Sequence, residues 1–138
     1  MGKGKSRNPE AFNLLVMTDE VDQRIYNDHI KENFKDVDLL ISCGDLPFYY
    51  LEFVIDSLNR PMYFVHGNHD PKVELSSAGE KKQPWGAENL DNQVVCHKGL
   101  ILAGFEGCLS YSSGLYEYSQ FQMWIKVLRI VPKLVINK

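Results

Sequence analysis

Three short, mostly apolar segments in the first half of the chain predict three β-strands. They cover residues 12–17, 37–43 and 62–66. Apolar side chains occupy consecutive positions in each segment, which is typical of parallel strands that are covered on both faces. The pattern therefore indicates a buried parallel sheet.

The two segments that separate these strands have the spacing of helices. In the range 21–34, apolar residues recur at near-helical intervals on one side, which predicts one amphipathic helix. We expect the second helix to begin at Pro47, which suits a first helical position, and to end at 59–61. Its apolar stripe consists of Phe48, Leu51, Ile55 and Leu58. The order strand, helix, strand, helix, strand favours a parallel α/β layer.

The second half of the chain is less regular. Residues 71–92 are polar and loop-like, and we expect them to cover or flank a site. Two short apolar segments, 94–96 and 100–103, predict a β-hairpin with glycine in its turn. A final helical pattern follows, and we expect Pro132 to end it, because proline interrupts the hydrogen bonds of a helix.

Composition narrows the class of protein. The 138 residues suit one domain, which we place at 11–138 after a disordered tail at 1–10. The longest apolar runs are far shorter than the ~20 residues that span a bilayer. A net charge of -3 and a pI near 5.8 give no basic field for nucleic acid. Widely spaced cysteines and the lack of a signal-peptide core predict a cytoplasmic protein with free, mostly buried thiols.

Each of the three predicted strands is followed by a side chain that can bind a metal ion. Asp19 follows the first strand, Gly44-Asp45 follows the second, and Gly67-Asn68-His69-Asp70 follows the third. Ligands of parallel α/β layers bind at the carboxyl ends of the strands, where these residues are expected to meet. Oxygen ligands together with an imidazole suit Mn, Fe, Co, Ni or Zn. The sequence therefore predicts a metal site at this edge of the sheet.

These motifs resemble those of the calcineurin-like metallophosphoesterase superfamily. The similarity covers about residues 13–107 and includes a further Gly-containing turn at 104–107. It implies a β-sandwich core flanked by helices, of which this chain would hold the N-terminal βαβαβ half. It also implies two divalent metal ions in the cleft and a hydrolase that cleaves phosphate esters, as a phosphatase or a phosphodiesterase.

The same resemblance implies a role for each matching side chain. Asp19 would bind the first metal, Asp45 would bridge the two metals, and Asn68 would bind the second. His69 would lie just outside the metal ligands, where it stabilises the phosphate or protonates the leaving oxygen, with Asp70 orienting it. A pair of metals of this kind activates a water molecule for in-line attack on the phosphate ester.

The chain departs from the family pattern at two places. Most members have Asp-x-His in the first motif, whereas Val21 stands here in the position of the histidine. Either Glu20 reaches into the site, another residue substitutes, or the first metal site is weak. No histidine follows His97, although the family takes further metal ligands from later motifs.

An apolar run at 134–136 begins just before the sequence stops at residue 138. We therefore expect the domain to be incomplete and truncated at its C-terminal side. A shortened fold would expose a sheet edge and apolar surface, which favours self-association or a partner chain that covers the missing half. The alternative function is a non-catalytic scaffold or protein-binding module on the same fold.

Overall fold

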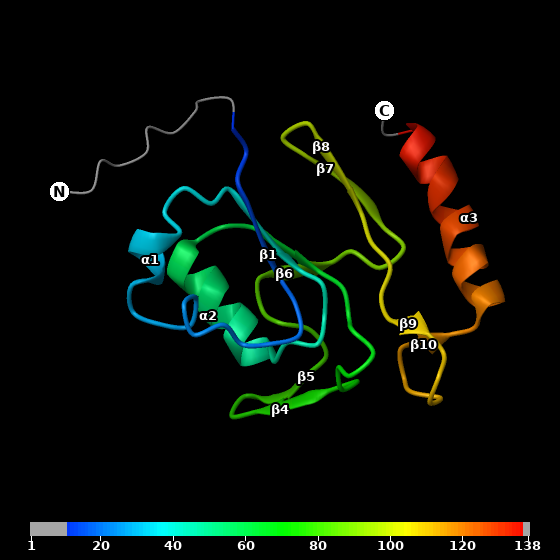
Figure 1. Cartoon of the computed structure of the whole chain (residues 1–138), viewed down its shortest axis with the longest axis horizontal. Coiled ribbons are helices and arrows are strands. Elements are labelled where there is room, and N and C mark those ends of the chain that lie inside the picture. Colours follow the sequence, from blue (N-terminus) through cyan, green and yellow to red (C-terminus); the bar gives the residue numbers. More distant parts are fainter. Residues whose placement is uncertain (1–10, 137–138) are drawn as a thin grey trace.

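The computed structural model describes residues 11–136, so the tail predicted at 1–10 lies outside the described residues. The elements, coloured along the chain in Figure 1, are β1 (Leu14–Met17), α1 (Ile30–Asn33), β2 (Leu39–Ser42), α2 (Phe48–Leu58), β3 (Met62–Phe64), β4 (Glu74–Ser76), β5 (Gly79–Lys81), β6 (Ala87–Asn89), β7 (Val94–His97), β8 (Leu100–Ala103), β9 (Cys108–Leu109), β10 (Glu117–Tyr118) and α3 (Gln120–Ile136).

The central element is a parallel sheet with the strand order β1-β2-β3-β6. Leu14 lies opposite Leu39 and Leu40 lies opposite Met62, which confirms the three predicted strands and their parallel pairing. The sequence predicts a loop where β6 forms, but this segment pairs with β3 as a fourth parallel strand. Its Ala-Glu-Asn sequence has low strand propensity, so pairing with β3 rather than local preference makes it a strand.

Both faces of the sheet are covered. On one face the strands pack against α2 and the segment before α1, in a core that contains Met17, Ile30, Leu40, Tyr50, Leu51, Val54, Met62 and Phe64. On the other face the buried residues Leu39, Tyr63 and Leu90 pack against Val95, Leu100 and Leu102 of the β7–β8 hairpin. Figure 1 shows the hairpin between the sheet and α3. The prediction of a mixed α/β fold is confirmed.

The single helix predicted for residues 21–34 is wrong, because only Ile30–Asn33 is helical. Short polar side chains in this segment bind neighbouring backbone groups and so compete with helical hydrogen bonds. The Asp22 carboxylate accepts from the Arg24 N–H at 2.8 Å, and the Asn27 side-chain Oδ1 accepts from the His29 N–H at 2.8 Å. Ile25 and Ile30 are still buried, so the apolar spacing produces turns with one buried side instead of a helix.

The second predicted helix is confirmed as α2, with one difference at its start. Pro47 is extended and precedes the helix as its N-cap, and Asn59 ends the helix in the left-handed region with φ of 49°. The Glu74 carboxylate accepts from the Phe48 N–H at 3.0 Å and so satisfies a free donor of the first turn. Burial raises the pKa of Glu74. A residue of the β4–β5 hairpin thus caps α2.

The predicted hairpin is confirmed as β7–β8, with Lys98 and Gly99 in its turn. Both have positive φ, 48° and 85°, as a two-residue turn between right-twisted strands requires. The prediction that Pro132 ends the last helix is wrong, because α3 continues to Ile136. Pro132 and Leu128 are both exposed, so water can reach the Leu128 carbonyl that the proline leaves without a partner.

Lys126 attaches α3 to the rest of the fold. Its side chain is buried, and its Nζ lies 2.9 Å from Asp91 Oδ1 and 3.5 Å from Glu106 Oε1. The ammonium also lies over the Tyr118 ring, 3.9 Å from its centroid. Burial and the hydrogen bond to Glu106 raise the pKa of the Tyr118 hydroxyl, which therefore stays protonated. The buried ammonium of Lys126 is thus paired with the carboxylates of Asp91 and Glu106.

Two further predictions concern surface properties. Cys43 and Cys96 are exposed and Cys108 is half-buried, so the thiols are free as predicted, but the prediction that they are mostly buried is wrong. Within residues 11–136, no helix has both the length and the apolar character needed to cross a membrane.

Replacing Leu40 by Ala should lower the free energy of unfolding by about 2–5 kcal/mol. Leu40 is fully buried between the sheet and α2, so the truncation leaves a cavity in the main core. Leu75→Ala is the matched control, because Leu75 is 85% exposed and its truncation should change stability by less than about 0.5 kcal/mol. Urea denaturation of both variants measures the difference. Equal losses would contradict the core described here.

Candidate metal and phosphate site

The loops that follow β1 and β2 are joined through their backbones. The Cys43 N–H donates to the Met17 carbonyl at 2.9 Å, and the Asp19 N–H donates to the Gly44 carbonyl at 3.3 Å. The Thr18 hydroxyl reaches the same Gly44 carbonyl at 3.4 Å. Asp19 is therefore held beside the loop that carries Asp45.

The loops after β2 and β3 approach each other so closely that glycine is required in both. A Cβ added to Gly44 would lie 2.2 Å from the Gly67 nitrogen, and Gly44 also has φ of +94°. A Cβ added to Gly67 would lie 2.2 Å from Asp45 Oδ1. Neither position accepts a side chain without moving the backbone or the Asp45 carboxylate.

Asp19 and Asp45 both adopt the left-handed backbone conformation, with φ of 64° and 59°. Asp and Asn tolerate this region better than other residues with side chains. Asp19 is exposed, whereas Asp45 is half-buried and its Oδ1 accepts from the His69 N–H at 2.7 Å. The Asp45 carboxylate therefore lies directly against the third motif.

Asn68 and His69 are consecutive residues in the loop that follows β3. The Asn68 side-chain Nδ2 donates to the Tyr111 hydroxyl at 2.8 Å and lies 3.2 Å from His69 Nε2. A neutral His69 with its proton on Nδ1 accepts this second hydrogen bond. The His69 ring is exposed, so a ligand can reach it.

Asp70 is buried and contacts backbone groups of both glycine loops. Its Oδ2 accepts from the Gly67 N–H at 2.8 Å and from the Asp45 N–H at 3.1 Å. The same oxygen lies 3.7 Å from His66 Nδ1. That Asp70 orients His69 stays a prediction, because the contacts of Asp70 given by the structure are to these other groups. These contacts show that the Asp70 carboxylate holds the loop after β2 and the loop after β3 together.

His66 is a supporting residue that sequence reasoning missed, because it was assigned only to a strand. It is buried, and its ring stacks on Tyr116 with centroids 4.7 Å apart and planes 6° apart. Its carbonyl accepts from the Gly107 N–H at 2.8 Å. The turn at 104–107, noted from its glycines, thus binds the backbone just before the third motif.

Tyr111 and Glu117 were also missed, and both belong to the loop 110–117. The Glu117 carboxylate accepts from the backbone N–H groups of Tyr111, Ser112 and Ser113 at 2.9, 2.8 and 2.9 Å. Hydrogen bonds from the Ser112 hydroxyl and from the N–H groups of Ser112, Tyr111 and Gly114 lower the pKa of Glu117 from 4.5 to about 2. The only signal in the sequence is a Tyr- and Ser-rich composition, which does not indicate where the loop lies.

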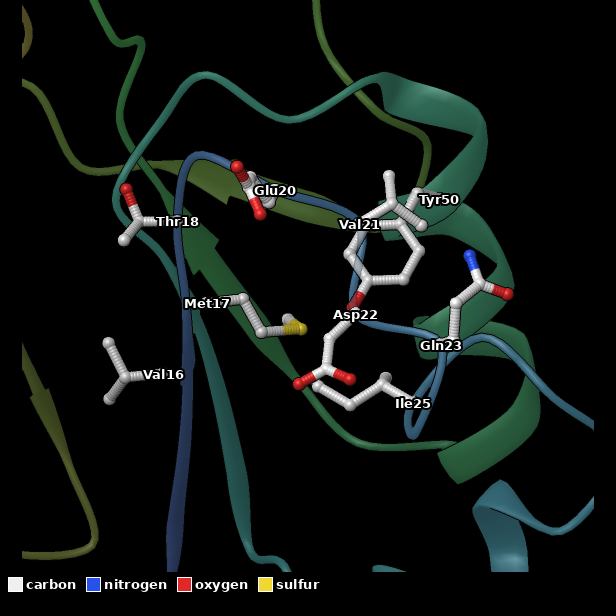
Figure 2. Close-up of a pocket in the computed structure, with 9 residues that line it drawn as sticks. All are labelled: Val16, Met17, Thr18, Glu20, Val21, Asp22, Gln23, Ile25 and Tyr50. Carbon is white, nitrogen blue, oxygen red and sulfur yellow. The ribbon is translucent and has the colours of Figure 1, made fainter.

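Val21 and Glu20 line an open cavity next to Asp19. The cavity has a volume of about 560 Å³ and lies between the end of β1, the following turns and Tyr50 of α2. Figure 2 shows the side chains that line it. Val21 also packs against the main core. Val21 is therefore part of the hydrophobic packing, and both of its sequence neighbours, Glu20 and Asp22, line the cavity and carry carboxylate oxygens.

The side chains predicted to bind metal carry oxygen atoms of the kind that divalent cations prefer. Asp19, Asp45 and Asn68 lie in three loops that contact one another, and carboxylate and amide oxygens suit divalent cations. Within the described residues, however, no group of three or more Asp, Glu, His or Cys side chains gathers closely enough to hold a metal.

The fold is an α/β protein whose candidate site residues lie in the loops after its parallel strands. The family model for calcineurin-like phosphoesterases matches residues 9–128, and the chain belongs to this family. The resemblance of the sequence motifs to this superfamily is therefore confirmed. No curated protein and no solved structure matches the chain. Members of the family generally bind divalent metals and act on phosphate esters.

Replacing Asp70 by Asn should lower the free energy of unfolding by about 2 kcal/mol, because the N–H groups of Gly67 and Asp45 lose a charged acceptor. The exposed residue Asp56, changed to Asn, is the control. Urea denaturation at neutral pH measures both. Unchanged stability of Asp70→Asn, together with an altered pH profile of activity, would instead support a role in orienting His69.

The stabilising effect of Glu117 should depend on pH. Its pKa in the folded chain, about 2, is below its ordinary value of 4.5, so its contribution is present above about pH 4.5 and is lost as the pH falls towards 2. We expect the stability difference between the wild type and Glu117→Gln to be largest near pH 6 and to shrink steadily below about pH 4.5. Urea denaturation at several pH values measures this, with the exposed Glu80→Gln as control. A difference that is independent of pH would contradict the arrangement.

Proposed function

We infer that the chain acts in metal-dependent hydrolysis of phosphate monoesters or diesters through a metal-activated water. The observation that carries this inference is the hydrogen bond of 2.7 Å from the His69 N–H to Asp45 Oδ1. It joins the loop of Asp45, which would bind metal, to the loop that carries Asn68 and His69. Residues with three different proposed roles are thereby held in one place.

Divalent metal ions would be held by Asp19, Asp45 and Asn68. The loop that carries Asp45 contacts the loops of the other two residues. Mn, Fe, Zn, Ni and Co are all compatible with these ligands and a neighbouring imidazole. When bound, such ions lower the pKa of a water molecule and stabilise the negative charge that develops on the phosphate. The chain contributes the fixed loop geometry, through Asp70 and the two close glycines.

His69 is the residue that would act on the phosphate ester itself. Its backbone is fixed by Asp45, whereas its ring is exposed and can meet a substrate. A protonated ring stabilises negative charge on the phosphate and can donate a proton to the leaving oxygen. General acid catalysis of this kind typically contributes ~100- to 10,000-fold. Asp70 would help His69 indirectly, by fixing the loop that carries it.

A non-catalytic scaffold is the second candidate, and two observations favour it. The ligand set of the described residues is partial. In addition, α3 exposes apolar side chains along its length, namely Phe121, Trp124, Leu128, Val131 and Val135. An exposed apolar surface of this kind fits a partner chain or a second copy of this one.

His69→Ala should reduce kcat by about 100-fold or more if His69 is the general acid, and Asp45→Asn should abolish turnover. We would measure hydrolysis of p-nitrophenyl phosphate and bis(p-nitrophenyl) phosphate in the presence of Mn²⁺. His29→Ala is the matched control, because that histidine side chain is 74% exposed and belongs to a different segment.

Turnover by the wild type that is lost in both site variants and kept in His29→Ala would support the hydrolase. No Mn²⁺-dependent turnover by the wild type, together with self-association or partner binding that His69→Ala leaves unchanged, would favour the scaffold instead.

A further inference from the structure

Tyr111 is an exposed aromatic side chain whose end lies at the candidate site. Its hydroxyl is 2.8 Å from Asn68 Nδ2, and the same nitrogen lies 3.2 Å from His69 Nε2. The hydroxyl is thus within two hydrogen-bond lengths of the His69 ring. Tyr111 is 68% exposed, so a ligand can still contact most of its surface. The ring therefore borders the place where a phosphate ester would meet His69.

The base of the loop that carries Tyr111 also lies near the candidate site. Partial burial raises the pKa of the Cys108 thiol, and the negative charges of Glu117 and Asp45 raise it further. Such an effect requires a short distance, because solvent screens charges that are far apart. One residue earlier, the Gly107 N–H donates to the His66 carbonyl at 2.8 Å. The loop thus begins beside both Asp45 and the third motif.

The loop is held in its shape by its own contacts. The Glu117 carboxylate accepts from three consecutive backbone N–H groups, beginning with that of Tyr111. At the base of the loop, the strands β9 and β10 pair with each other. A side chain on a backbone that is already ordered loses less freedom when a ligand contacts it. The ring of Tyr111 is therefore prepared for a ligand.

The chemistry of the loop limits the kind of group that its surface would contact. Glu117 is the only charged residue at positions 110–117, and its carboxylate is occupied by the N–H groups of the loop. The large apolar or aromatic side chains that the loop exposes are Tyr111 and Leu115. This surface offers no cation to a second acidic group of a ligand. An uncharged aromatic ring is the group that suits it, because rings stack on or pack edgewise against tyrosine.

We propose that Tyr111 is a specificity-determining residue that packs against an aromatic ring carried by the phosphate ester. This proposal rests on the proposed function, since it places the ester beside His69. Contact between two aromatic rings changes an equilibrium constant by about two- to tenfold beyond the effect of burial alone. The chain should therefore favour an aryl ester over an alkyl ester, and should do so only while residue 111 is aromatic.

The test compares phenylphosphonate with methylphosphonate, which carry the same phosphonate group and are not hydrolysed. Isothermal titration calorimetry would measure the Kd of each with the full chain and Mn²⁺, for the wild type, Tyr111→Phe and Tyr111→Leu. The ratio of the two Kd values is the readout, because it cancels changes in the binding of metal or phosphonate. We expect phenylphosphonate to bind about two- to tenfold more tightly to the wild type. Tyr111→Phe should keep this preference, and Tyr111→Leu should lose it.

Tyr49→Leu is the matched control, since Tyr49 is 56% exposed and lies on α2, and its ratio should equal that of the wild type. A wild-type ratio near one would overturn the role of the Tyr111 ring. So would a preference that Tyr111→Leu leaves unchanged or that Tyr111→Phe also abolishes. In each of these cases, binding of methylphosphonate would still support the proposed function. A wild type that binds neither phosphonate with Mn²⁺ would overturn the proposed function, and the role of Tyr111 with it.

Discussion

One buried carboxylate oxygen, Oδ2 of Asp70, holds together the loops that form the candidate site. It accepts backbone N–H groups from the loop after β2 and from the loop after β3. These loops carry Asp45 and Asn68. At Gly44 and Gly67 their backbones approach too closely to admit a side chain. A buried acceptor with two charge-assisted hydrogen bonds is costly to displace. The relative position of the proposed ligands therefore depends on a residue that need not touch a metal.

The rest of the fold supports this contact from both sides of the sheet. The main core fixes the strands on the α2 side, and the hairpin fixes them on the other. Beyond the hairpin, Lys126 links α3 to the turn at 104–107 through Glu106, and that turn binds the His66 carbonyl through Gly107. A series of buried and half-buried polar contacts thus runs from the last helix to the residue just before the third motif.

Sequence reasoning succeeded where the signal was local and strong. Apolar runs predicted β1, β2 and β3, and the stripe that begins at Phe48 predicted α2. It failed for 21–34, where Asp22 and Asn27 bind nearby backbone, and for β6, which exists only through pairing with β3. The strand-end motifs were found because their spacing is distinctive, and their loops do meet. Tyr111 was not found, because no local pattern indicates a contact between residues 43 apart.

The loop at 110–117 closes on itself, since the groups that organise it lie within the same few residues. The loops that carry the proposed metal ligands are fixed separately, by Asp70 and the paired glycines. The two regions are therefore organised by different parts of the chain. They meet where the Asn68 amide donates to the Tyr111 hydroxyl, so an insertion in the loop that displaced Tyr111 would also release the Asn68 side chain.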